Sequence, residues 1–142
     1  MEEKVYYSTF DNKKLCGILN ANNTSKKVVV ICHARTSSKD SRPTTMLANY
    51  LSKVKINNFR FDFISCGESD GEYNDYTVSN MVLNLKDTLI FLKEKGFEKG
   101  LYKLLIGFNS LEIENVYSFK IFNTVLIKKT KEACAPIESF KR

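Results

Sequence analysis

Apolar and polar residues alternate along this chain in blocks that predict strands and helices in turn. Residues Val28–Cys32 form an unbroken, mostly β-branched apolar run, which is typical of a strand buried on both faces of a parallel sheet. The run ends abruptly at the polar stretch His33–Asp40. In open α/β sheets, chemistry gathers at the carboxyl ends of the strands, so this polar turn is the first place to look for a site.

The residues before this strand predict an antiparallel hairpin at an edge of the sheet. Val5–Phe10 is strand-like, Asp11–Lys14 has the composition of a turn, and Leu15–Asn20 predicts a second strand. A polar loop, Asn22–Ser25, then leads to the central strand.

The polar turn is followed by a predicted helix. Pro43 suits the first turn of a helix, since its missing N–H would be unpaired there in any case. Four apolar residues fall on one face of this helix: Met46, Leu47, Tyr50 and Leu51.

The chain then alternates once more between strand and helix. Ile56–Phe63 predicts a strand, and Ile64–Tyr76 predicts a long loop. Apolar residues keep helical spacing from Val78 to Lys95, with Gly96 as the stop, and Leu104–Ile106 predicts a short strand. This order predicts a single α/β domain over residues 1–142, with a mainly parallel sheet.

Composition narrows the function classes. The 142 residues are 43% hydrophobic and 27% charged, as in ordinary globular proteins. No apolar run approaches the ~18 residues of a membrane span, and the N-terminus lacks a signal-peptide layout, so we expect a cytoplasmic protein. The net charge of +6 is spread over scattered lysines, which favours a solvated surface over nucleic-acid binding.

Metal and cofactor sites are not predicted. The four cysteines are widely spaced and predict free, mostly buried thiols: Cys16, Cys32, Cys66 and Cys134. One histidine does not make a zinc site, and no phosphate-binding glycine motif is present. We therefore expect no metal and no cofactor.

Three pieces of the chain, in order, match one known family. They are the turn His33–Asp40, the strand Arg60–Phe63 with the loop Ser65–Tyr73, and the helix Val78–Leu92 followed by Leu104–Ile106. Together, Val28–Gly96 resembles the N-terminal half of an α/β-hydrolase of the esterase, lipase and serine aminopeptidase-like kind. The resemblance implies a three-layer α/β sandwich, incomplete at its C-terminus, and an ancestral hydrolysis of carboxylic ester or amide bonds.

The resemblance also assigns an oxyanion turn to His33, Ala34 and Arg35. Backbone N–H groups in such a turn stabilise the oxyanion of a tetrahedral intermediate, and the Arg35 N–H is the expected donor. The family has glycine where this chain has Ala34. We favour a structural role for His33, which orders the turn, over a catalytic one. Asp62 is expected to anchor the end of its strand.

The nucleophile elbow of the family has the form Gly-x-Ser-x-Gly. Counted from Gly107, the nucleophile position holds Asn109, and an amide does not replace a hydroxyl. Ser110 is the alternative nucleophile, with Leu111 as the second oxyanion donor, but Glu112 then stands where a glycine belongs. A plain loop or helix-capping role for Ser110 is the preferred interpretation.

No histidine follows Ser110, although a serine hydrolase needs a histidine base and an acid to orient it. Two hypotheses follow. One is a hydrolase that acts on a small ester or peptide, with missing groups supplied by another chain. The other, which the absent acid and base favour, is a truncated, non-catalytic binding or assembly protein. We also expect self-association through an exposed sheet edge.

Overall fold

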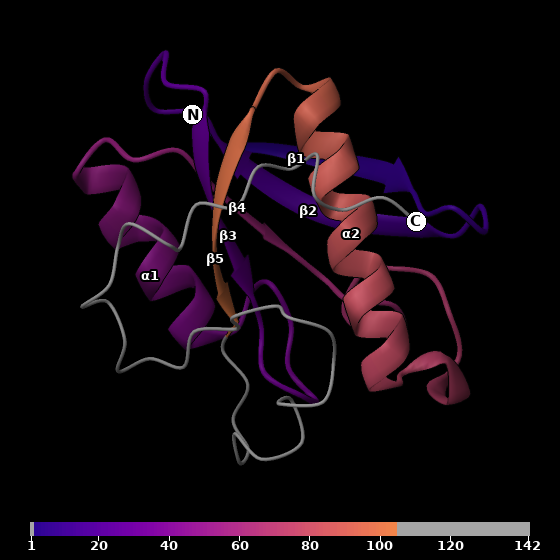
Figure 1. The fold of residues 1–142 in the computed structure, drawn as a ribbon. Helices are drawn as coiled ribbons and strands as arrows, with labels where there is room; N and C mark the ends of the chain where they lie inside the picture. Colours follow the sequence, from indigo (N-terminus) through magenta and orange to yellow (C-terminus); the bar gives the residue numbers. More distant parts are fainter. Residues whose placement is uncertain (1, 105–142) are drawn as a thin grey trace.

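Five strands form one mixed sheet in the computed structural model, which describes the backbone of residues 2–104 and the side chains of residues 2–98 (Figure 1). The strands are β1 (Glu2–Ser8), β2 (Lys14–Asn20), β3 (Lys27–Cys32), β4 (Asn58–Phe61) and β5 (Lys99–Leu104). The helices are α1 (Arg42–Lys53) and α2 (Val78–Glu94), with a short 3-10 helix at Tyr73–Asp75.

The strand order is β1-β2-β4-β3-β5. β1 and β2 form the predicted antiparallel hairpin, and β2 continues antiparallel onto β4. β3 lies between β4 and β5 and is parallel to both. Because β3 has a strand on each side, its apolar run is central in the sheet, as the sequence predicts.

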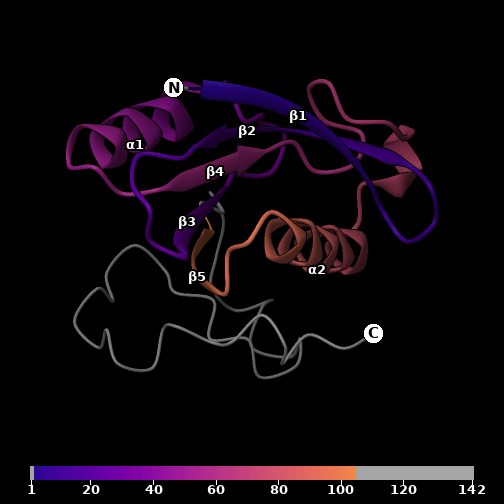
Figure 2. The ribbon, with the colours of Figure 1, turned by 90° about the horizontal axis from the view of Figure 1, so that it is seen from above.

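The two helices cover opposite faces of the sheet (Figure 2). Alternate residues of β3 therefore enter different cores. Val28, Val30 and Cys32 belong to the core under α2, whereas Ile31 contacts the core under α1. This is the layered α/β arrangement expected from the alternation of strands and helices.

The apolar face that the sequence predicts for α1 is only partly buried. Leu51 is buried and Leu47 is half-buried, but Met46 and Tyr50 are 59% and 62% exposed. The helix instead places Thr44, Ala48 and Leu51 against the sheet. Small residues at the contact bring the helix backbone close to β3 and β4, whereas the side chains of Met46 and Tyr50 point outward.

Three strands also differ from their predicted ranges. β1 is Glu2–Ser8, which begins and ends earlier than the predicted Val5–Phe10, and β4 covers only Asn58–Phe61. β5 begins at Lys99, earlier than the predicted strand at Leu104–Ile106. Parallel pairing with Lys27–Cys32 sets the position of β5. Residues 105 and 106 lie outside the described residues.

Neither described helix has the length and hydropathy needed to cross a membrane. Within residues 2–98, no group of three or more histidine, cysteine, aspartate or glutamate side chains is arranged to hold a metal ion.

Candidate functional site at the carboxyl ends of β3 and β4

His33 follows β3 directly and is fully buried. The backbone N–H of Phe63 can only donate, so Nε2 of His33 is the acceptor of that 3.1 Å bond. Nδ1 then carries the proton and donates to the carbonyl oxygen of Ala34 at 2.8 Å. Burial lowers the pKa of His33, which favours this neutral form. Both ring nitrogens are thus used to order the turn.

The turn after His33 spans residues 34–37. The N–H of Ser37 donates to the carbonyl oxygen of Ala34 at 3.1 Å, and Thr36 has a φ of +59°. A positive φ at the third residue alone is the signature of a type II turn, which favours glycine at that position. The strain therefore lies at Thr36, not at Ala34, where the family's glycine is replaced.

The backbone N–H groups of the turn have different partners. The N–H of Thr36 donates to the hydroxyl of Tyr76 at 3.2 Å, which ties the turn to the loop before α2. No described residue accepts a hydrogen bond from the N–H of Arg35, and Arg35 is exposed. This N–H is the group that the resemblance assigns to the oxyanion. Its catalytic role stays a prediction.

A buried lysine, Lys39, links the turn to the end of β4. Its side chain is 1% exposed, and its Nζ lies 2.9 Å from carboxylate oxygens of Asp40, Asp62 and Glu68. Burial alone would lower the pKa of Lys39, but these three hydrogen bonds outweigh it and raise the pKa. Lys39 is therefore a cation at physiological pH and cannot act as a base or nucleophile.

Asp62, the residue directly after β4, forms an ion pair with this lysine. Its carboxylate also accepts the backbone N–H groups of Lys39, at 2.7 Å, and Glu68, at 3.0 Å. The side chain is fully buried. The expectation that Asp62 anchors the strand end agrees with these bonds, and a catalytic role would require it to release them.

The loop from Ile64 to Tyr76 is held by its own polar residues. Ser69 accepts the backbone N–H of Cys16 and donates to the carbonyl oxygen of Asp62. Ser65, which stands where the family has a glycine, adopts a φ of +64°. Its hydroxyl bonds the carbonyl oxygen of Glu72. The hydroxyl thus compensates for a backbone conformation that suits glycine better.

Sequence reasoning missed Lys39 and Tyr76 as parts of this site. Both lie in polar segments, where solvent exposure is the ordinary expectation for such residues. A buried carboxylate such as Asp62 implies a cation nearby, but the sequence does not say which lysine supplies it. The other predicted site residues, Asn109, Ser110 and Leu111, lie outside the described residues.

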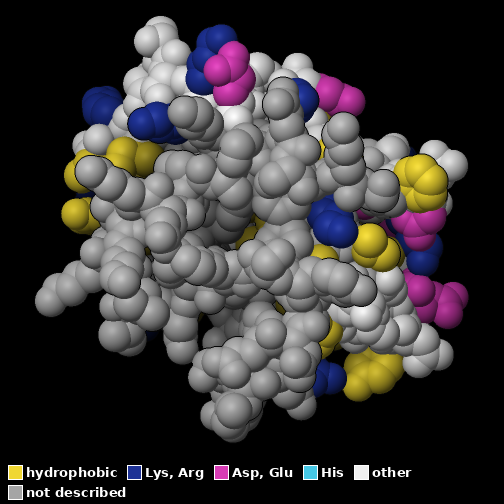
Figure 3. Space-filling model, in the orientation of Figure 1, with side chains coloured by type: hydrophobic (Ala, Val, Ile, Leu, Met, Phe, Trp, Pro, Cys, Tyr) yellow, Lys and Arg dark blue, Asp and Glu magenta, His cyan; other side chains and the backbone are white. Residues whose placement is uncertain are grey.

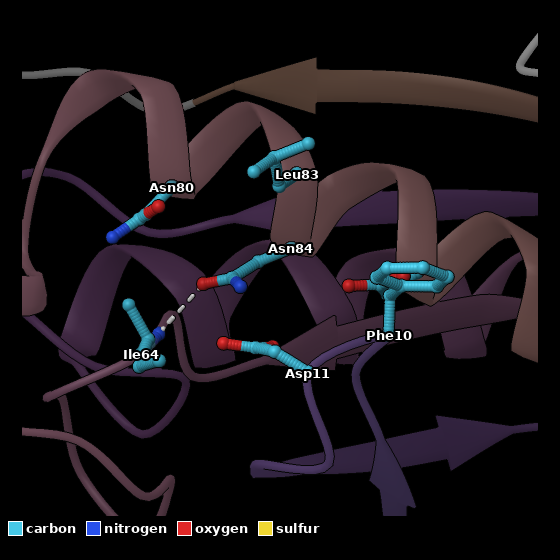
Figure 4. Close-up of a pocket in the computed structure, with 7 residues that line it drawn as sticks. Phe10, Asp11, Ile64, Asn80, Leu83 and Asn84 are labelled. Carbon is cyan, nitrogen blue, oxygen red and sulfur yellow. Dashed lines mark hydrogen bonds between the residues drawn. The ribbon is translucent and has the colours of Figure 1, made fainter. Parts of the chain in front are cut away.

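Two surface cavities lie elsewhere, between the β1–β2 hairpin and α2. One is lined by Phe10, Asp11, Ile64 and four residues of α2, and the other runs along Tyr7 and Phe91. In the first, the Oδ1 of Asn84 accepts the backbone N–H of Ile64 at 2.9 Å (Figure 4). Neither cavity includes a residue of the turn at 34–37, so neither is the site that the resemblance predicts.

Comparisons with known proteins support the fold. No family model and no curated protein matches the chain. Among solved structures, esterase Pf2001 of Pyrococcus furiosus is 28% identical, with a TM-score of 0.64 over 72% of this chain and 40% of the esterase. Est1E of Butyrivibrio proteoclasticus, with ferulic acid bound, is 22% identical, with a TM-score of 0.63 over 70% of this chain and 41% of Est1E.

A lidless serine hydrolase of Xanthomonas campestris shows the same fold at 15% identity, with a TM-score of 0.61 over 72% of this chain and 49% of the hydrolase. The described residues are a diverged N-terminal portion of an α/β-hydrolase fold. The chain spans about 40% of the length of Pf2001 and of Est1E. This relation confirms the predicted fold class, and it places the turn at 34–37 within a fold that other proteins use for hydrolysis.

Proposed function

We propose that this α/β-hydrolase portion keeps the carbonyl-binding turn of a carboxylic ester or amide hydrolase but has little or no turnover as an isolated chain. The observation that carries the proposal is the state of His33. It is the one histidine in the sequence, it is buried, and both of its ring nitrogens bond backbone groups. No free imidazole is left in the 142 residues to serve as a general base.

The positive part of the proposal concerns the Arg35 N–H. It lies at the second position of a type II turn, in an exposed residue, and no described residue accepts it. An N–H in this position, held by the bonds of His33 and Thr36 on either side, is preorganised to donate to a carbonyl or carboxylate oxygen. Its ligand would be a small ester, amide or carboxylate.

One substitution pair tests this N–H selectively. Proline is favoured at the second position of a type II turn and has no N–H, so Arg35→Pro should remove the donor while keeping the turn. Arg35→Ala removes the charged side chain and keeps the N–H. We expect acetate, a carboxylate analogue of the product, to shift the backbone amide resonance of residue 35 in the wild type and in Arg35→Ala. In Arg35→Pro, the neighbouring Thr36 and Ser37 amides should no longer respond. An equal response in both variants would contradict the proposal.

Turnover is tested separately. The purified chain is incubated with a fluorophosphonate probe and with p-nitrophenyl butyrate, beside a Ser110→Ala variant and a heat-denatured sample. We expect no labelling and no hydrolysis above the denatured sample. Labelling of Ser110 that is lost on heating would refute the non-catalytic part and would show that an elbow and a base are present.

The alternative is activity with a complementing chain that supplies the acid and base. The observation that favours it is the position of β5. Among the described strands, β5 pairs on one side only, with β3, so its other side is open to a further strand from residues outside this part or from another chain. Hydrolysis that appears only when a second polypeptide is added would distinguish this alternative. The cytoplasmic location stays a prediction.

A further inference from the structure

The outer face of α1 carries an exposed apolar stripe. Met46, Tyr50 and Val54 are 59%, 62% and 47% exposed and lie four residues apart. Residues at this spacing are neighbours on one side of a helix. The stripe, defined as Met46, Tyr50 and Val54, therefore runs along α1 to its C-cap.

The stripe faces away from the sheet. Successive helical residues turn by about 100°, so Met46 and Tyr50 each lie roughly opposite Ala48. Ala48 is fully buried, as expected for the side that faces β3. The stripe is thus not part of the core that α1 makes with the sheet, and the fold of the described residues leaves it uncovered.

The charged residues of α1 and of the segment after it have one sign. Arg42, Lys53 and Lys55 are exposed, and residues 41–57 contain no aspartate or glutamate. None of these three cations forms an ion pair with a described residue. Figure 3 shows hydrophobic side chains at the left edge, over α1, beside lysine and arginine side chains.

From this juxtaposition we propose that the outer face of α1 docks on an anionic lipid surface. An apolar helical face with basic residues beside it lies in the membrane interface, where the apolar side chains enter the headgroup region and the cations contact anionic lipids. Tyrosine suits this boundary because it has an apolar ring and a polar end. Such a helix lies on the membrane and does not span it.

The charges argue against a second copy of this chain as the occupant. Two copies packed through this face would bring six cations together with no carboxylate from residues 41–57 to pair with them. Like charges at an interface are costly, whereas an anionic surface neutralises them. The inference is independent of the proposed hydrolase function, since it uses neither the turn at 34–37 nor any reaction.

The absence of tryptophan from the chain gives a direct test. Tyr50→Trp places a single fluorophore in the stripe, and Tyr73→Trp places one at a residue that is 88% exposed elsewhere. Both variants are mixed with vesicles of phosphatidylcholine alone or with about one-third phosphatidylserine. For Tyr50→Trp we expect a blue shift of the tryptophan emission and co-sedimentation only with phosphatidylserine, with loss of both in high salt. The emission of the Tyr73→Trp variant should not shift.

A matched pair of charge variants tests the cations in the Tyr50→Trp background. Lys53→Glu with Lys55→Glu should weaken vesicle binding at least about tenfold, given the contribution of each basic residue near such a surface. Lys14→Glu with Lys95→Glu makes the same change in net charge at exposed positions outside α1, with Lys95 directly after α2 on the other face of the sheet, and binding should fall much less. Circular dichroism confirms that each variant is folded.

Three results would overturn the proposal. They are equal binding to both vesicle types, equal loss of binding in the two charge variants, and co-sedimentation of Tyr50→Trp without a blue shift of its emission. A blue shift that grows with protein concentration in the absence of vesicles would also overturn it, because a second copy would then cover the stripe.

Discussion

The two faces of the sheet are covered unequally. Among residues 2–98, the core under α2 contains fifteen buried residues, drawn from β1, β2, β3, β4, the helix and the segments beside it. The core under α1 contains three of these described residues, Ile31, Ala48 and Leu51. Burial of apolar surface is the main source of stability, so within the described part of the chain the α2 face contributes most of the stabilising energy.

The ends of α2 are also more favourable than the ends of α1. The Thr77 side chain caps the start of α2 by accepting the N–H of Asn80, whereas the cap residue of α1, Ser41, makes no such bond. Past its last turn, α2 has Gly96 at a φ of +94°, but α1 has Lys55 at +60°. Glycine adopts this conformation without strain, and lysine does not. Compared with α1, α2 therefore has the larger buried core and the more stable helix ends.

Lys39 connects the layer of α1 with the layer of α2. It lies three residues before α1, yet it pairs with Asp62 and Glu68 in the segment that leads to α2. Glu68 in turn accepts hydrogen bonds from Lys4 and Tyr6 of β1. A weakly packed layer is thus connected to the stable one through a charged cluster beside the candidate site.

Removing the Lys39–Asp62 ion pair should lower the free energy of unfolding more than any other change considered. In Lys39→Met, the carboxylate of Asp62 stays buried without its cation, and we expect a loss of about 3–5 kcal/mol in the free energy of unfolding, measured in urea. Adding Asp62→Asn removes the uncompensated charge and should recover part of the loss. A loss below about 1 kcal/mol would show that the pair is not as buried as described.

Matched truncations compare the two cores directly. Leu89→Ala, in α2, should cost about 3–4 kcal/mol, because Leu89 is fully buried in the larger core. Leu51→Ala, in α1, should cost about 2 kcal/mol, because the smaller core can relax more easily around the cavity. Equal losses on urea denaturation would mean that the layers are equally stabilising.

The residues that end the two helices in the left-handed conformation, Lys55 after α1 and Gly96 after α2, can each be replaced. Lys55→Gly should stabilise the protein by about 1 kcal/mol, since it removes a left-handed side chain at the end of α1. Gly96→Ala should destabilise it by a similar amount; a Cβ there meets no atom within 4 Å, so backbone strain is the only cause. Thermal unfolding checks both, and shifts of the same sign would contradict the comparison.

The smallest expected effect is on how the free energy of unfolding changes at acid pH. Hydrogen bonds from Lys39, then Lys4 and Tyr6, lower the pKa of Glu68 to about 2, from an ordinary 4.5. A lowered folded-state pKa means that this stabilisation is present above about pH 4.5 and is lost as the pH falls towards 2. Glu68→Gln should therefore flatten the loss of stability in this window, measured by urea midpoints between pH 2 and 6. Glu94→Gln, at an exposed position on α2, is the control and should leave the slope unchanged.

The sequence by itself determined the elements and their order. The run Val28–Cys32, the hairpin before it and the helix that stops at Gly96 are all present, because local periodicity and glycine conformation are properties of short segments. The resemblance that begins at His33–Asp40 also predicted the fold class that the solved structures show.

Only the tertiary structure decided which face of α1 is buried and where Lys39 lies. Met46 and Tyr50 satisfy the helical apolar pattern, but the close approach of α1 to β3 selects Ala48 instead. Lys39 reads as an exposed residue of a polar turn until folding brings Asp62, 23 residues away, to within 2.9 Å. The physical reason is common to both: the free energy of burying a side chain depends on the partners that meet it, and those partners are distant in the sequence.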